Sequence, residues 1–119
     1  MIIAVPRETD TNEARVSTTP HSAAELIKAG YTVRIESGAG ENSFFSDNDY
    51  QNVDVEIISS KEELFNEADI IIKVTPPGKE EISLMAKGTV CISFFQPTID
   101  TEKVMAMSET GITGLSMHL

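Results

Sequence analysis

The sequence has one cysteine, no tryptophan and no long hydrophobic run. Because Cys91 has no second cysteine to pair with, an intrachain disulfide is excluded and a reducing compartment is favoured. No apolar segment approaches the roughly 20 residues that a membrane-spanning helix requires, so we expect no direct membrane insertion. The first segment, residues 1–6, is too short and too poor in basic residues to resemble a secretory signal.

Basic residues and histidines are also scarce. Nine Lys and Arg residues stand against 19 Asp and Glu residues, which gives a formal net charge of -10. This charge argues against nucleic acid and anionic membrane surfaces as partners, although a few local cations can still bind a phosphorylated ligand. The two histidines, His21 and His118, are isolated from each other and from Cys91. We therefore expect no metal site.

Strand-like and helix-like segments alternate along the whole chain, about six times. This alternation predicts an α/β fold: an open, mostly parallel, Rossmann-like (flavodoxin-like) three-layer sandwich of about six strands. The length of 119 residues is that of a single domain, residues 1–119. Helices are expected after caps at Thr19 and Ser60 and over residues 47–53, 79–86 and 100–109; strands are expected over residues 2–5, 32–36, 56–58, 70–74, 89–94 and 112–117.

A glycine-rich turn follows the expected strand 32–36. Gly38-Ala39-Gly40 resembles the start of a dinucleotide-binding fingerprint, but Ser43 stands where the third glycine belongs. No long helix opens at this point either, because Ser46 and Asp47 begin a new cap. We interpret this stretch as a turn that leads into a short helix and not as a phosphate-binding loop.

Ligands of open parallel sheets bind outside the carboxyl ends of the strands. Three polar side chains are expected near that edge: Arg15, Lys73 and Gln96. An arginine can hold a carboxylate or phosphate by two points, and a lysine can hold a further oxygen. The alternatives are a surface ion pair for Arg15, a solvent-directed side chain for Lys73 and a loop-stabilising amide for Gln96.

The sequence identifies no catalytic residue with confidence. No Ser/His/Asp or Cys/His combination stands at the expected strand ends, so general acid–base catalysis by this chain alone has little support. Cys91 lies within an apolar segment with no cationic neighbour in the sequence. We therefore expect a buried, inert thiol and not a nucleophile.

A series of motifs occurs in one order along the chain. It includes residues 13–20 (Glu13-Ala14-Arg15-Val16-Ser17-Thr18-Thr19-Pro20), 30–33, 36–40, 45–50 and 68–74 (Ala68-Asp69-Ile70-Ile71-Ile72-Lys73-Val74). Together these motifs resemble the N-terminal domain shared by alanine dehydrogenase and the alpha subunit of proton-translocating NAD(P) transhydrogenase. The resemblance covers essentially the whole chain. It implies that Arg15 and Lys73 match the arginine and lysine that hold pyruvate in this family.

The resemblance is closer to the transhydrogenase branch. Alanine dehydrogenases carry a catalytic histidine at the position of Gln96, whereas residues 93–97 and 112–117 are similar to transhydrogenase sequences. His118 departs from the acidic residue that usually follows in that branch. Two alternatives stay open: an alanine dehydrogenase-like lobe with altered chemistry, and a non-catalytic interaction module.

The resemblance also implies a larger protein. The chain would be the N-terminal lobe of a two-domain component, with the NAD-binding Rossmann domain beyond Leu119. Hydride would pass between NAD(H) on this component and NADP(H) on a partner component, and a membrane component would couple the transfer to proton movement. We expect a homodimer that is cytoplasmic and peripheral to the inner membrane through its partner subunits. The isolated 119 residues are expected to be inactive and to bind no cofactor alone.

Overall fold

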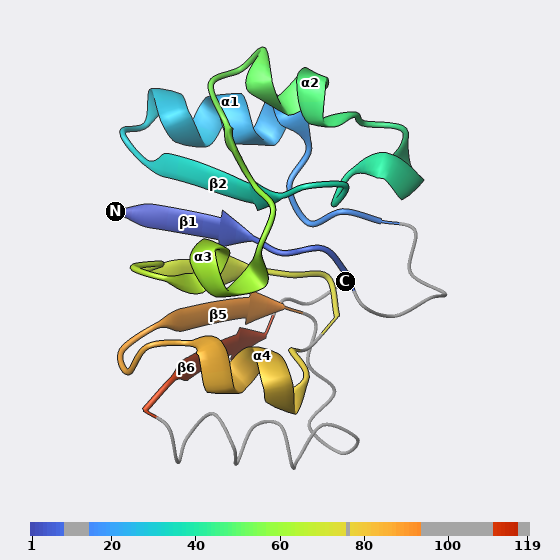
Figure 1. Cartoon of the computed structure of the whole chain (residues 1–119). Coiled ribbons are helices and arrows are strands. Elements are labelled where there is room, and N and C mark those ends of the chain that lie inside the picture. Colours follow the sequence, from blue (N-terminus) through green and yellow to red (C-terminus); the bar gives the residue numbers. More distant parts are fainter. Residues whose placement is uncertain (9–14, 76, 94–110, 117–119) are drawn as a thin grey trace.

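One sheet of six parallel strands organises the chain (Figure 1). The computed structural model describes residues 1–8, 15–75, 77–93 and 111–116. The strand order is β3-β2-β1-β4-β5-β6, and every neighbouring pair is parallel. This is the Rossmann order, and it confirms the expected open α/β fold. The strands are β1 (Ile2–Val5), β2 (Thr32–Glu36), β3 (Glu56–Ile58), β4 (Ile70–Ile72), β5 (Val90–Ser93) and β6 (Thr113–Ser116).

Helices cover both faces of the sheet, which makes the three expected layers (Figure 1). One face packs against α1 (Pro20–Lys28) and α2 (Asp47–Gln51), and the other against α3 (Lys61–Phe65) and α4 (Lys79–Leu84). Alternate residues of β1 serve the two cores: Ala4 packs with α3 and α4, whereas Ile3 and Val5 pack with α1 and α2. Such two-sided burial explains why the central strands are continuous apolar runs.

Capping side chains fix the starts of two helices where the sequence predicts them. The Thr19 hydroxyl accepts a hydrogen bond from the Ser22 N–H, and Pro20 occupies the first helical position of α1. Ser46 and Asp49 form a reciprocal capping box at α2. These caps also set the positions of the loops that precede both helices, at the carboxyl edge of the sheet.

Several element ends differ from the sequence-based expectation. Ser60 precedes α3 as expected, but its side chain makes no capping hydrogen bond, so the expected cap is wrong. The strand expected over residues 70–74 ends at Ile72, because the Val74 N–H turns away from the ladder and donates to Glu8. The helices α2 and α4 end two residues earlier than expected. The expected helix over residues 100–109 lies outside the described residues, as do the ends of the last two expected strands.

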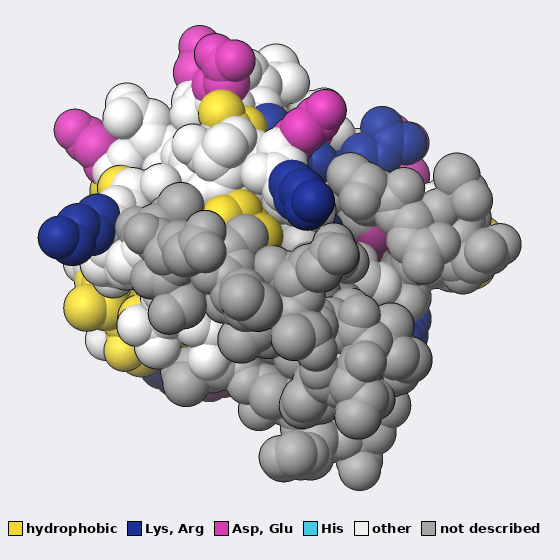
Figure 2. Space-filling view, turned by 90° about the horizontal axis from the view of Figure 1, so that it is seen from below, with side chains coloured by type: hydrophobic (Ala, Val, Ile, Leu, Met, Phe, Trp, Pro, Cys, Tyr) yellow, Lys and Arg dark blue, Asp and Glu magenta, His cyan; other side chains and the backbone are white. Residues whose placement is uncertain are grey.

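None of the helices in the described part of the chain is long and apolar enough to cross a membrane. Figure 2 shows one face of the molecule, where side chains of Lys, Arg, Asp and Glu lie among smaller groups of hydrophobic ones. Among the described residues, Met1 and Phe44 are the large hydrophobic side chains that are exposed, and Phe44 is 95% exposed.

Candidate functional site

The carboxyl ends of β1 and β4 form the topological switch point of the sheet. From β1 the chain passes to β2 and β3 on one side, and then crosses to β4 on the other side. At such a point the connections that follow two neighbouring strands lead in opposite directions along the sheet. Ligands of this fold usually bind in the crevice outside the carboxyl ends of these strands. In Figure 1 the strand arrows point to one common edge of the sheet. The side chains at this edge are therefore the candidate functional residues.

The Glu8 carboxylate joins the segment after β1 to the segment after β4. Its Oε2 accepts a hydrogen bond from the Val74 N–H at 3.1 Å. Its Oε1 accepts two from Thr75, one from the backbone N–H at 3.0 Å and one from the hydroxyl at 2.8 Å. The side chain is only 4% exposed. A carboxylate so far removed from water needs several donors, and these three supply them.

Lys73 lies beneath Glu8 with its side chain completely buried. Its Nζ is 3.5 Å from Glu8 Oε1 and 3.5 Å from Glu81 Oε1. Glu81 Oε1 also accepts a hydrogen bond from the Gly78 N–H at the start of α4. Within the described residues, Lys73 Nζ donates no hydrogen bond of good geometry. Its contacts with the two carboxylates are therefore ion pairs.

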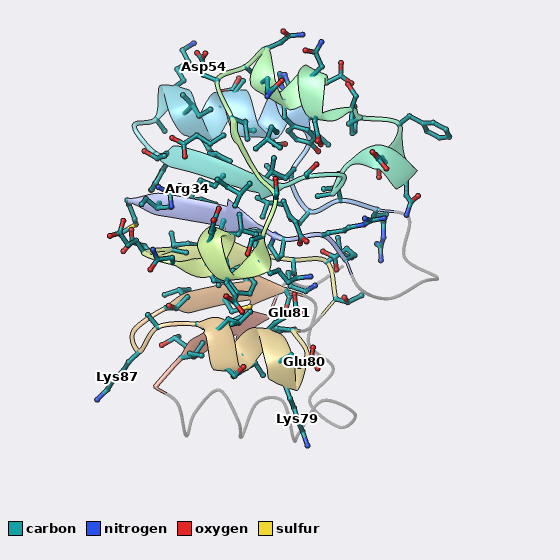
Figure 3. All side chains as sticks on the ribbon, in the orientation of Figure 1. Arg34, Asp54, Lys79, Glu80, Glu81 and Lys87 are labelled. Carbon is teal, nitrogen blue, oxygen red and sulfur yellow. The ribbon has the colours of Figure 1, made fainter. Side chains whose placement is uncertain are left out.

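The alternation of charges continues across the α3 and α4 face. Lys61 of α3 lies 3.5 Å from Glu81 Oε2 and 3.4 Å from Glu36 Oε1. Figure 3 shows Glu81 between α3 and α4, whereas Lys79 of the same helix points away from α3. We call the set of five side chains the charge chain; its members are Glu8, Lys73, Glu81, Lys61 and Glu36.

The charge chain also reaches the segment after β1. The Arg7 N–H donates to Glu36 Oε1 at 2.8 Å, and Lys61 Nζ donates to the Arg7 carbonyl oxygen at 3.3 Å. Residues 7 and 8 are thus held by both β2 and β4, the strands that flank β1. Because the two ends of the charge chain meet there, the geometry of this edge depends on all of its members.

The three residues predicted to line the cleft have different environments. Arg15 is exposed, and two residues later the Ser17 hydroxyl donates to the Ile72 carbonyl oxygen at 2.8 Å, at the end of β4. Lys73 is buried against Glu8 and Glu81. Gln96 lies outside the described residues. Ligand contact by any of the three stays a prediction.

The glycine turn after β2 is filled by a carboxylate of the protein itself. Asp47 accepts a hydrogen bond from the Ser37 hydroxyl at 2.6 Å and from the Gly38 N–H at 2.9 Å. Gly40 has no room for a side chain, because an added Cβ would lie 2.7 Å from Tyr50 Cε2. The short helix α2 follows. The interpretation as a structural turn is therefore confirmed.

Two buried side chains, Tyr50 and Cys91, have a raised pKa. The Tyr50 hydroxyl donates to the Thr18 carbonyl oxygen at 2.8 Å. Burial, together with the charges of Asp49 and Asp47, raises the pKa of Tyr50 to about 12. Burial also raises the pKa of the Cys91 thiol to about 12, although nearby Lys73 opposes the shift. Cys91 is completely buried, as the sequence predicts.

The sequence analysis missed Glu8, Thr75 and Glu81. Glu81 had one usable signal: a glutamate three residues after Gly78 matches a helix start. For Glu8 the only signal in the sequence was its position in the loop after an expected strand. Within the described residues, no group of three His, Cys, Asp or Glu side chains is arranged to hold a metal ion.

Comparison with known proteins shows strong similarity over nearly the whole chain. The family model "Alanine dehydrogenase/PNT, N-terminal domain" matches residues 4–119. The NAD(P) transhydrogenase subunit alpha of Cereibacter sphaeroides is 40% identical over 119 residues, which are 100% of this chain and 23% of that protein. The alanine dehydrogenase of Mycolicibacterium smegmatis is 33% identical over 116 residues, 98% of this chain and 31% of that protein.

A solved structure agrees. The transhydrogenase from Sinorhizobium meliloti superimposes with a TM-score of 0.92 at 31% identity, covering 98% of this chain and 34% of that chain. The chain thus spans between about a quarter and a third of the proteins that it matches.

Proposed function

Because the chain belongs to the alanine dehydrogenase/PNT N-terminal domain family, we propose that it is the N-terminal lobe of the NAD(H)-binding alpha component of a proton-translocating NAD(P) transhydrogenase. The family is one of oxidoreductases. In the complete enzyme, hydride would pass between NAD(H) on this component and NADP(H) on a partner component. The observation that carries this choice is the 40% identity with a transhydrogenase alpha subunit over the full 119 residues.

The contacts at the switch point support the role of a cleft wall. A dinucleotide-binding Rossmann domain offers free backbone N–H groups to the pyrophosphate, from a glycine-rich turn after its first strand. Here Pro6, Arg7 and Glu8 follow β1, and Glu8 already binds the N–H groups at the end of β4. The described residues therefore do not fit a pyrophosphate site. We assign dinucleotide binding to a second domain, beyond residue 119.

A lobe that forms one wall of the cleft contributes to the reaction by its position and not by chemistry of its own. Hydride transfer needs two nicotinamide rings held close together with water excluded, and the cofactors supply the chemistry themselves. The lobe would close one side of the nicotinamide cleft and pack against a dimer mate. The NADP-binding and membrane components would be its partners, and the assembly would lie on the cytoplasmic side, peripheral to the inner membrane.

The second candidate is an alanine dehydrogenase lobe, which the 33% identity with the Mycolicibacterium smegmatis enzyme favours. The two functions differ in substrate. We expect the full-length protein, mixed with an NADP-binding component, to reduce an NADP+ analogue with NADH. Robust NADH oxidation that depends on pyruvate and ammonia would establish the dehydrogenase instead.

The non-catalytic alternative is tested by cofactor binding. Calorimetry with NADH should give binding for the full-length protein and little or none for the 119 residues alone. Absence of NADH binding by the full-length protein would favour an interaction module.

A further inference from the structure

Three buried polar atoms on the α3 and α4 face of the sheet have no hydrogen-bond partner within the described part of the chain. They are Lys73 Nζ, Glu81 Oε2 and Ser93 Oγ. All three residues are at most 4% exposed. Buried polar groups in folded proteins are nearly always hydrogen-bonded, because an unmet donor or acceptor is costly. These three atoms therefore need a partner.

The three side chains come together at the carboxyl ends of β4 and β5. Cys91 of β5 packs in the core against α3 and α4, and Ser93 faces the same side because side chains alternate along a strand. The Lys73 N–H donates to the Ile92 carbonyl oxygen at 2.9 Å, which places Lys73 beside Ser93. Glu81 reaches this face from α4 (Figure 3), and its Oε1 is 3.5 Å from Lys73 Nζ.

The ion pairs around these atoms are wide. Every lysine–carboxylate contact in the charge chain measures 3.4 or 3.5 Å. A hydrogen bond between an ammonium group and a carboxylate is about 2.7–2.9 Å long. Other donors hold the carboxylates in place: Glu81 Oε1 accepts from the Gly78 N–H, and Glu8 Oε1 accepts from Thr75. The remaining donors and acceptors are therefore left for another molecule.

One water molecule has the hydrogen-bonding groups that these atoms require. An ammonium group only donates, a carboxylate only accepts, and a hydroxyl does either. Water can accept from Lys73 Nζ, donate to Glu81 Oε2 and bond to Ser93 Oγ. Three hydrogen bonds are typical of a buried water. Ions suit the place less well, because a cation would face the ammonium group and an anion would face the carboxylates.

We propose that Lys73, Glu81 and Ser93 bind one internal water molecule, and that Lys73 is a structural cation of the lobe and not a residue that binds the ligand of the cleft. An ammonium group has three donors. The carboxylates of Glu8 and Glu81 and the water account for all three, and the Lys73 side chain is completely buried. This assignment goes beyond the proposed function, because it holds whichever reaction the complete protein catalyses. It differs from the role that the family resemblance implies for Lys73.

A high-resolution crystal structure tests the water site directly. One water oxygen should lie within about 3.2 Å of Lys73 Nζ, Glu81 Oε2 and Ser93 Oγ. Direct hydrogen bonds among these three side chains, with no water between them, would overturn the site.

Urea unfolding tests whether the Ser93 hydroxyl has a partner. Ser93→Ala should raise the equilibrium constant for unfolding roughly tenfold, because the water and its other partners lose a hydrogen bond. Ser59→Ala is the matched control on an exposed serine and should change it little. In a Lys73→Met background, Ser93→Ala should have a smaller effect. An unchanged or lower constant in Ser93→Ala alone would overturn the proposal, because removal of a hydroxyl without a partner costs nothing.

Chemical labelling of lysines tests the role of Lys73 and needs no activity. In the full-length protein, acetic anhydride should modify Lys73 at least roughly tenfold more slowly than the exposed Lys28, whether or not NADH and pyruvate are added. Mass spectrometry measures both rates. Reaction of Lys73 as fast as Lys28, with protection by either added compound, would establish a ligand-binding lysine and overturn the proposal. Because the readout is independent of transhydrogenation and amination, failure of the proposed function is recognised separately.

Discussion

Lys73 and Glu81 form an ion pair of 3.5 Å in which both side chains are at most 5% exposed. Each ion of a buried pair has lost its hydration and depends on the other for compensation. Removal of one ion therefore leaves the other as an unpaired buried charge, which destabilises the fold. Glu8 completes the group on the other side of the ammonium. The switch point of the sheet is therefore filled by mutually dependent charges, and its stability is sensitive to the loss of any one of them.

Replacement of Lys73 by methionine should lower the free energy of unfolding by about 3–5 kcal/mol, because two buried carboxylates lose their shared cation. Urea unfolding followed by circular dichroism measures this change. The control is Lys28→Met on the exposed last turn of α1, for which a loss below about 1 kcal/mol is expected. Equal losses in both variants would show that the Lys73 charge has no special role.

Tyr50 should ionise near pH 12, above the ordinary value of 10, because burial and two neighbouring carboxylates disfavour the phenolate. A folded-state pKa above the unfolded one gives stability that is complete below about pH 10 and is lost as the pH rises toward 12. Absorbance at the phenolate band in a Tyr31→Phe background reports Tyr50 alone. Ionisation of the folded protein near pH 10 would contradict the prediction.

The Cys91 thiol should be inert in the folded protein. Its side chain is completely buried and burial raises its pKa to about 12, so almost no thiolate exists at neutral pH. A chromogenic disulfide reagent at pH 8 should react slowly with the native protein and rapidly once urea unfolds it. Fast reaction before unfolding would show that Cys91 is accessible.

Gly40→Ala should destabilise the protein by about 1–3 kcal/mol, because the new methyl group would meet Tyr50 and the carbonyl oxygen of Phe45 within 3 Å. Gly78→Ala is the matched control: nothing lies within 4 Å of an added Cβ there, and the backbone φ is -74°. The control should change stability by less than about 1 kcal/mol. Thermal melting compares the two variants. A similar melting temperature for both would mean that the turn can relax.

The sequence was sufficient to predict the layers of the fold. Strands over residues 2–5, 32–36 and 56–58 lie where the β-branched apolar pattern predicts them, and Thr19-Pro20 begins α1. The pattern fails at the end of β4, because the Val74 N–H binds a side chain that is 66 residues away. Hydrophobic periodicity carries no information about such a contact.

The site was only partly predictable for the same reason. Lys73 stands out as a cation at a strand end, but its two partners had to be chosen from 19 acidic residues without a local signal. Glu8 and Glu81 come from different loops, and only the sheet order brings them to one place. Arg15 could be identified as a candidate by its position in a loop after an expected strand.

The central position of β1 has a consequence for folding while the chain is being synthesised on the ribosome. β1 pairs with β2 on one side and with β4 on the other. Residues 1–58 contain three neighbouring strands, β1, β2 and β3. The other edge of β1, with Glu8 beside it, has no partner strand until residues Ile70 to Thr75 have been synthesised. The charge chain is completed later still, when α4 supplies Glu81, and β5 and β6 then extend the sheet.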